Sequence, residues 1–87
     1  YQWDAAKNAA NIRKHGINFE DPKPIFYKPI MVLESSRNEE KRWVAIGKLD
    51  ALFVAVIFTM RDKQVRIISA RRARRHEERA YRSKEDQ

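Results

Sequence analysis

The chain has 87 residues, of which 43% are hydrophobic, 10% aromatic and 36% charged. A chain of this length can bury one modest core, so we expect a single domain over residues 1–87. The 19 Lys and Arg residues outnumber the 12 Asp and Glu residues and give a net charge of +7. This balance favours polyanionic partners, namely nucleic acid, an acidic protein or an anionic membrane surface.

Several classes of site are excluded by the composition. The absence of cysteine rules out a disulfide scaffold, a thiolate nucleophile and a cysteine-based zinc site. Two histidines are too few for a convincing protein-only metal site, so we expect neither a metal nor a cofactor. The longest apolar run, residues 51–60, is about half of the roughly 20 residues that a membrane-spanning helix needs. With no stretch that resembles a signal peptide, we expect a cytoplasmic protein without membrane contact.

Residues 4–16 carry the signals of a helix of about three turns. Asp4 is an acidic N-cap residue, the residues after it are good helix formers, and Gly16 suits the position after the last turn. Three apolar residues recur at i, i+4 and i+7, which predicts a stripe that faces the core: Ala5, Ala9 and Ile12. Three prolines between residues 22 and 29 limit the next segment to one short helix or turn.

The middle of the chain has the patterns of three or four antiparallel strands. Residues 30–34 are rich in β-formers and residues 42–47 alternate in polarity, which predicts two strands. Residues 52–59 are apolar on both faces, as in a central strand that is covered on both sides. A hairpin turn at residues 61–63 leads to a last strand at residues 64–70.

The chain ends in a predicted helix over residues 73–82, which contain no helix breaker. Two N-terminal helices, an antiparallel sheet of three to four strands and a C-terminal helix indicate an α+β fold rather than a doubly wound sheet.

Arginine is concentrated near the C-terminus. Between residues 66 and 82 lie seven arginines and two glutamates. On the predicted helix four of these arginines recur at spacings of three, four and three and would form one stripe: Arg72, Arg75, Arg79 and Arg82. Arginine offers phosphate a planar donor fork that lysine lacks, so the stripe favours nucleic acid. A solvated surface helix with Glu77 and Glu78 as local counter-ions is the alternative.

Two further residues extend this predicted surface. Arg66 lies in the last strand, where we expect it to share a face with Ile68 and Ala70 and to be held stiffly. Tyr81 follows Arg75 by six residues and offers a stacking platform for an unpaired base. Tyr81 can also anchor the helix on the sheet, which is the interpretation that we favour.

Three side chains in the basic regions can transfer protons. His15 ends the first helix, where the helix dipole favours its cationic form, and a capping role is the interpretation that we favour from its position, with proton transfer as the alternative. His76 and Glu77 lie among the C-terminal arginines, which would keep Glu77 ionised.

Three motifs follow one another along the chain. The first runs from Trp3-Asp4 to residues 13–20 (Arg-Lys-His-Gly-Ile-Asn-Phe-Glu). The second is residues 40–47 (Glu-Lys-Arg-Trp-Val-Ala-Ile-Gly), and the third is residues 66–73 (Arg-Ile-Ile-Ser-Ala-Arg-Arg-Ala), which a helix follows. Together these motifs resemble the BrnT family of type II toxins. The resemblance covers nearly the whole chain, and three motifs in order are far more specific than one short pattern.

This resemblance implies a RelE-like fold and a ribonuclease activity that arrests translation. It also implies neutralisation by a ribbon-helix-helix antitoxin, through which the toxin–antitoxin complex binds promoter DNA. The family motifs carry over to a set of candidates for the active groove: Lys14, His15, Arg42, Arg66, Arg71, Glu77 and Tyr81. His76 departs from the family pattern, because it adds a titratable group where a fixed cation is usual.

Our hypothesis is therefore a metal-independent endoribonuclease in which the ribose 2′-OH attacks the adjacent phosphate, leaving a 2′,3′-cyclic phosphate and a 5′-OH. We expect Arg66 and Arg71 to stabilise the phosphorane oxygens. Glu77 or His15 would act as general base and His76 as acid. The remaining expected RNA contacts are Lys14, Arg42, Arg72, Arg75, Arg79 and Tyr81. A non-catalytic RNA- or DNA-binding module is the alternative, and a groove that docks an acidic antitoxin segment is compatible with the nuclease.

Overall fold

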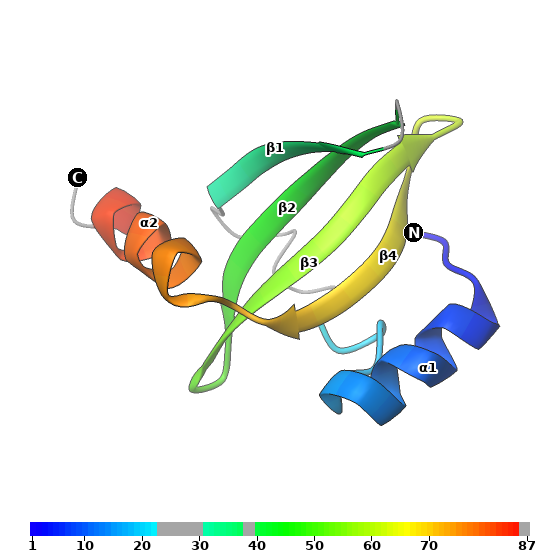
Figure 1. Cartoon of the computed structure of the whole chain (residues 1–87), viewed down its shortest axis with the longest axis horizontal. Coiled ribbons are helices and arrows are strands. Elements are labelled where there is room, and N and C mark those ends of the chain that lie inside the picture. The colour runs from blue at the N-terminus through cyan, green and yellow to red at the C-terminus, as the bar shows by residue number, and fades with distance from the viewer. Residues whose placement is uncertain (23–30, 38–39, 86–87) are drawn as a thin grey trace.

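The structure is a computed structural model that describes residues 1–22, 31–37 and 40–85. Its four strands form one antiparallel sheet in the order β1-β2-β3-β4 (Figure 1). The expected α+β class and antiparallel sheet are confirmed, whereas the short second helix predicted near the prolines lies mainly outside the described residues. The elements are α1 (Ala5–His15), β1 (Met31–Arg37), β2 (Glu40–Leu49), β3 (Leu52–Arg61), β4 (Gln64–Arg72) and α2 (Arg75–Glu85).

Helix α1 begins and ends where its local signals predict. The Asp4 carboxylate accepts hydrogen bonds from the backbone N–H groups of Lys7 at 3.2 Å and Ala6 at 2.8 Å, and these bonds lower the pKa of Asp4. Gly16 closes the helix in the left-handed region, with φ of 71°, and its N–H donates to the carbonyl of Ile12 at 2.8 Å.

The apolar stripe of α1 does not face the core, so that prediction is wrong. Ala5 and Ala9 are exposed, and Ile12 is 40% exposed. The helix instead turns Asn8 and Asn11 inward, and Asn11 is buried. Alanine fits a buried or an exposed helix face equally well, so its spacing alone did not determine the orientation.

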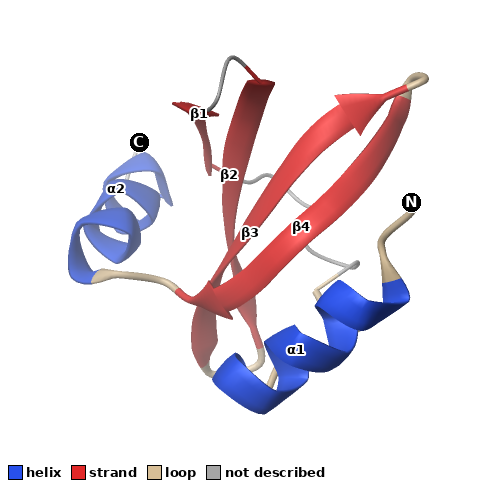
Figure 2. Cartoon of the chain, turned by 45° about the vertical axis from the view of Figure 1, so that its right-hand side comes forward, coloured by secondary structure: helices blue, strands red, loops and turns tan. Residues whose placement is uncertain are grey.

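The reason for this orientation is that α1 lies along β4, an edge strand of the sheet (Figure 2). An edge strand has backbone N–H and C=O groups that need partners. Asn11 supplies them, since its Nδ2 donates to the carbonyl of Ala70 at 2.7 Å and its Oδ1 accepts the N–H of Ala70 at 3.2 Å. A second Nδ2 bond reaches the carbonyl of Ile17 at 2.9 Å.

The two faces of the sheet carry separate buried clusters. The first cluster contains Ile17, Phe19, Val54, Val56, Ile67 and Ala70. The second contains Val44, Ile46 and Ala55, against which Ile57, Ala73 and Tyr81 pack. Strand β3 contributes to both clusters, as predicted for a central strand that is covered on both sides.

A bulge in β4 changes which residues share a face. Ile57 pairs with Ser69 but the next residue, Phe58, pairs with Ile67, so Ile68 is the extra residue. As a result Ile67 and Ala70 belong to the same cluster, and Arg66 lies on the opposite face from Ala70. The expectation that these two residues share a face is wrong, because the bulge interrupts strict alternation.

Helix α2 begins at Arg75, two residues later than predicted. The N–H of Ala73 still donates to the carbonyl of Phe53 at 2.8 Å, so the backbone remains paired with β3 up to this point. Arg72 therefore belongs to β4, and the predicted stripe of four arginines on one helix is wrong. In the described part of the chain, neither helix has the length and hydrophobicity that crossing a lipid bilayer requires.

Candidate active site

A pocket of about 480 Å³ opens on the face of the sheet that carries Val44 and Ile57. It lies between the end of α1 and the segment that enters α2, above strands β2, β3 and β4. Its lining residues are Lys14, His15, Arg42, Val44, Ile57, Ile68, Ser69, Arg71 and Arg74.

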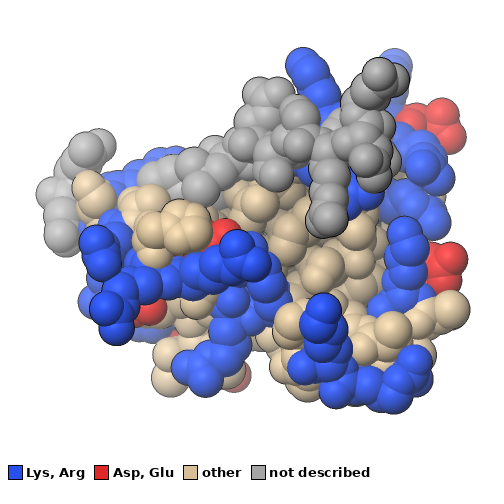
Figure 3. All heavy atoms as spheres, in the orientation of Figure 1, with Lys and Arg blue, Asp and Glu red and all other residues tan. Residues whose placement is uncertain are grey.

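The pocket combines a cationic rim with an aliphatic floor. One lysine and three arginines carry permanent positive charges, and Val44, Ile57 and Ile68 supply apolar surface. Among the residues that the structure describes, no carboxylate lines the pocket. Lys and Arg side chains also spread over the face of the molecule seen in Figure 3, with few acidic side chains between them. Such a pocket suits a ligand that carries both phosphate groups and a flat ring, such as a nucleobase, whose face can pack on apolar side chains.

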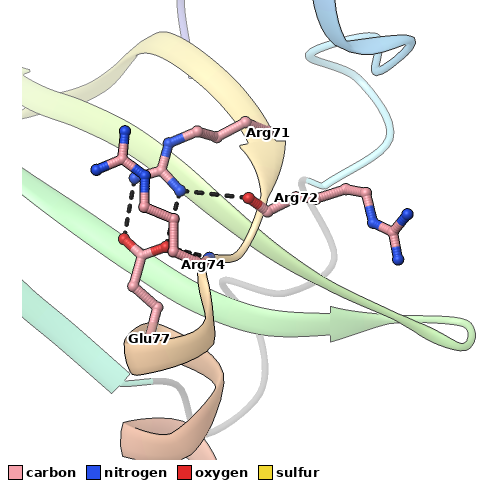
Figure 4. A network of polar contacts seen from close by, with 4 residues as sticks. All are labelled: Arg71, Arg72, Arg74 and Glu77. Carbon is pink, nitrogen blue, oxygen red and sulfur yellow. Dashed lines mark hydrogen bonds and ion pairs between the residues drawn. The ribbon is translucent and has the colours of Figure 1, made fainter.

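Arg71 is held in the pocket wall by Glu77 of α2 (Figure 4). Its Nη1 donates to Oε1 of Glu77 at 2.7 Å and its Nη2 donates to Oε2 at 2.9 Å, which makes a bidentate ion pair. The side chain of Arg71 is 17% exposed and that of Glu77 only 4%. Figure 4 shows Arg74 beside this pair and Arg72 pointing away from it.

Glu77 also fixes the start of α2. Its Oε1 accepts the backbone N–H of Arg74 at 2.7 Å, which is the hydrogen bond that an acidic residue makes in a capping box. Burial raises the pKa of the Glu77 carboxyl, but the bonds from Arg71 and Arg74 and the nearby charges of Arg71 and His76 outweigh it and lower the pKa. The carboxylate is therefore ionised and fully engaged at neutral pH, which makes it a weak proton acceptor.

The docking of α1 brings His15 to the pocket. His15 lies one turn after Asn11, on the same side of the helix, and is half-buried. Ser69 of the pocket wall donates its hydroxyl to Oδ1 of Asn11 at 3.2 Å. Asn11, which attaches α1 to β4, is therefore hydrogen-bonded to a residue that lines the pocket.

Several residues that we predicted for the site lie outside this pocket. Nη1 of Arg66 donates to Oε1 of Gln2 at 3.0 Å, where the N-terminal segment pairs with β4. His76 is exposed on α2. Tyr81 packs against Phe53 with 5.5 Å between the ring centroids, so it has the anchoring position that we favoured. Three predicted RNA contacts are exposed and do not line the pocket: Arg72, Arg75 and Arg79.

Sequence reasoning missed the pocket residues Arg74 and Ser69. Arg74 stands three residues before Glu77, and this capping-box spacing was a signal that could have placed it beside the Arg71–Glu77 pair. Ser69 gave no such signal, because the bulge at Ile68 decides which face it joins.

A family model for BrnT, the ribonuclease toxin of a type II toxin-antitoxin system, matches residues 3–77. The chain belongs to the BrnT family. A solved structure that resembles it is the 1.1 Å crystal structure of the ribonuclease toxin BrnT of Brucella abortus, with 32% sequence identity and a TM-score of 0.71. The match covers 85% of this chain and 95% of that one. Among proteins of curated function, none matches this chain significantly.

Membership of the BrnT family confirms the resemblance that we predicted from the three motifs. It gives the chain the class of a ribonuclease toxin, and thus an RNA substrate and an antitoxin partner.

Proposed function

We propose that this BrnT toxin is a metal-independent endoribonuclease whose catalytic centre is the cationic pocket. The bond from the ribose 2′-oxygen to phosphorus forms while the bond from phosphorus to the 5′-oxygen breaks, which leaves a 2′,3′-cyclic phosphate and a 5′-OH. The observation that carries the proposal is that four fixed cations and one imidazole share a single pocket. Negative charge grows on the phosphorane oxygens during attack, and preorganised donors stabilise it by several kcal/mol.

His15 is the proton-transfer group in this proposal. Imidazole is the side chain best suited to moving protons near neutral pH, and His15 is placed in the pocket by α1. It takes the proton of the 2′-OH, while the 5′-oxygen leaves with a proton from solvent. Glu77 is engaged by three N–H donors, and His76 lies outside the pocket, so neither takes this role.

The four cations hold the substrate. Lys14, Arg42 and Arg74 contact the phosphates on either side of the scissile bond, and Arg71 faces the scissile phosphate itself. The aliphatic floor receives the base of an unpaired nucleotide, so a single-stranded segment is the expected substrate.

The test is cleavage of a defined RNA in the presence of EDTA, with the product ends identified. We expect cleavage to persist and His15→Gln to slow it by about 10²- to 10⁴-fold, the usual contribution of one proton-transfer group. His76→Gln, which makes the same change outside the pocket, should cleave at close to the parent rate. Equal rates for the parent and His15→Gln would refute the role of His15, and RNA that is bound but never cleaved would indicate a nucleic-acid-binding module instead.

A second pair of variants tests the cations. Arg74→Ala removes a charge from the pocket and Arg61→Ala removes one from the exposed end of β3. We expect the first to weaken RNA cleavage at least tenfold and the second to have little effect. Similar losses in both variants would mean that net charge matters and the pocket does not.

The finer features of the family resemblance also belong to this proposal. They are a RelE-like fold within one domain over residues 1–87, arrest of translation by cleavage of cytoplasmic RNA, and a ribbon-helix-helix antitoxin that binds promoter DNA. An acidic antitoxin segment that fills the cationic pocket would neutralise the toxin. A salt-sensitive complex that blocks RNA cleavage supports this picture, and simultaneous binding of RNA and antitoxin contradicts it.

A further inference from the structure

We propose that Glu77 is a positioning residue that orders Arg71 and Arg74 for catalysis while it weakens the binding of RNA. The inference rests on the proposed function of the pocket. It assigns to the buried carboxylate a role other than that of general base.

The carboxylate of Glu77 accepts hydrogen bonds from two residues of the pocket wall. Glu77 holds the guanidinium of Arg71 with two hydrogen bonds at 2.7 and 2.9 Å and holds the backbone of Arg74 with a third at 2.7 Å. Both arginines line the pocket, whereas Glu77 does not. The Arg71 head is further fixed by a bond of 3.3 Å from Nη1 to the carbonyl of Arg72.

This arrangement orders Arg71 before substrate arrives. An arginine side chain loses much rotamer freedom when its head is fixed, and here the carboxylate has already fixed it in the folded protein. Nε–H and the second N–H of Nη2 remain for a phosphate, since both N–H groups of Nη1 are already donated. A donor that is held in place stabilises the transition state without reorganising.

The same ion pair reduces the attraction of the pocket for RNA. The charge of Glu77 lies against that of Arg71, so the pair adds little net positive charge to the rim. Affinity for the ground state then depends mainly on Lys14, Arg42 and Arg74. Removal of the carboxylate charge should therefore strengthen RNA binding and slow the chemical step at the same time.

The Glu77→Gln variant tests whether Glu77 positions the arginines. We expect kcat to fall by about 10²-fold, the usual penalty for a misplaced catalytic group. Binding of an RNA oligonucleotide with a 2′-deoxy residue at the cleavage site should tighten, and the slope of log K against log salt should steepen by about 0.7. Glu78→Gln is the matched control, because it removes the same charge from the same helix, whereas Glu78 binds Arg82 and not Arg71. It should leave kcat unchanged.

A double-mutant cycle tests whether Glu77 affects kcat through the arginines that it holds. If Glu77 acts by holding Arg71 and Arg74, the loss of kcat caused by Glu77→Gln should be much smaller in an Arg71→Ala background than in the parent, because only the bond to Arg74 is left to lose. A general base would instead give the same loss in both backgrounds and remove the acidic limb of the pH–rate profile. Either result would overturn the proposal, as would weaker RNA binding by Glu77→Gln.

Arg71→Lys provides a second test that leaves the cap of α2 intact. Lysine keeps the positive charge but cannot form a bidentate ion pair with Glu77. We expect RNA affinity within about threefold of the parent and a kcat at least tenfold lower. An unchanged kcat would overturn the positioning role. The affinity measurements need no cleavage, so a wild-type chain that failed to cut RNA would refute the proposed function and leave the charge argument separately testable.

Discussion

The Asn11→Ala substitution should destabilise this protein much more than the removal of one small side chain suggests. Asn11 attaches α1 to the edge of the sheet through bonds to both backbone groups of Ala70 and to the carbonyl of Ile17. Ala70 is fully buried and Ile17 is 8% exposed, so water has little access to these groups in the parent. Truncation would leave three backbone groups, one N–H and two C=O, without this partner, and the half-buried Ser69 hydroxyl would lose its bond to Asn11 as well.

The expected cost follows from those three groups. Each buried polar group that loses its partner costs about 1–3 kcal/mol, and entry of a water molecule into the vacated space favours the lower end, which gives about 3–5 kcal/mol in total. A chain of 87 residues has a typical free energy of unfolding of about 4–13 kcal/mol. At about 4–8 °C per kcal/mol, the melting temperature should fall by at least about 12 °C.

Urea unfolding followed by tryptophan fluorescence measures this cost, since Trp3 packs edge-on against Phe19 beneath the sheet, with 6.2 Å between ring centroids. Ile12→Ala is the control, because Ile12 is 40% exposed on the outer side of the same helix and its truncation should cost about 0.5 kcal/mol or less. This description of how α1 is attached would be refuted if Asn11→Ala lowered the free energy of unfolding by less than about 1 kcal/mol. It would also be refuted if Ile12→Ala lowered it more than Asn11→Ala does.

Three further predictions concern single backbone or charge features. Gly16→Ala should destabilise the protein by about 1 kcal/mol in thermal unfolding, because φ is 71° and the added Cβ meets no atom within 4 Å, so the cost is conformational. Lys63→Gly should stabilise it by about 1 kcal/mol in the same assay, because Lys63 has a φ of 64° in the turn between β3 and β4. Glu77→Gln should be less stable than the parent at neutral pH, and the gap should close as pH falls below about 4.5, since a lowered carboxyl pKa gives stability that protonation removes. A gap that is constant from pH 7 to pH 3 would contradict the last prediction.

Local signals in the sequence predicted the elements well. Asp4 and Gly16 set the ends of α1 through hydrogen bonds within a few residues, so their effect could be inferred without the rest of the fold. The apolar run of β3 likewise identified a strand buried on both faces. These features depend on neighbours in the chain.

The features that sequence reasoning missed depend on distant contacts. The inward face of α1 is set by the backbone of Ala70, which lies 59 residues after Asn11 and on an edge strand. The bulge at Ile68 reverses the alternation of β4 and thereby moves Ser69 to the pocket face. Motif reasoning brought Lys14, His15, Arg42 and Arg71 forward as candidates, and the fold gathers these four in one pocket. Counting charges along α2 gave Arg75 and Arg79 the same weight as the pocket arginines, although both are exposed and lie outside the pocket.

The most direct test of the central claim is an NMR titration of the folded chain with a short RNA that carries a 2′-deoxy residue at the cleavage site. We predict that the largest backbone shift changes fall on residues that line the cationic pocket, namely Lys14, His15, Ser69, Arg71 and Arg74. Changes confined to the exposed arginines of α2, with the pocket residues unmoved, would contradict it.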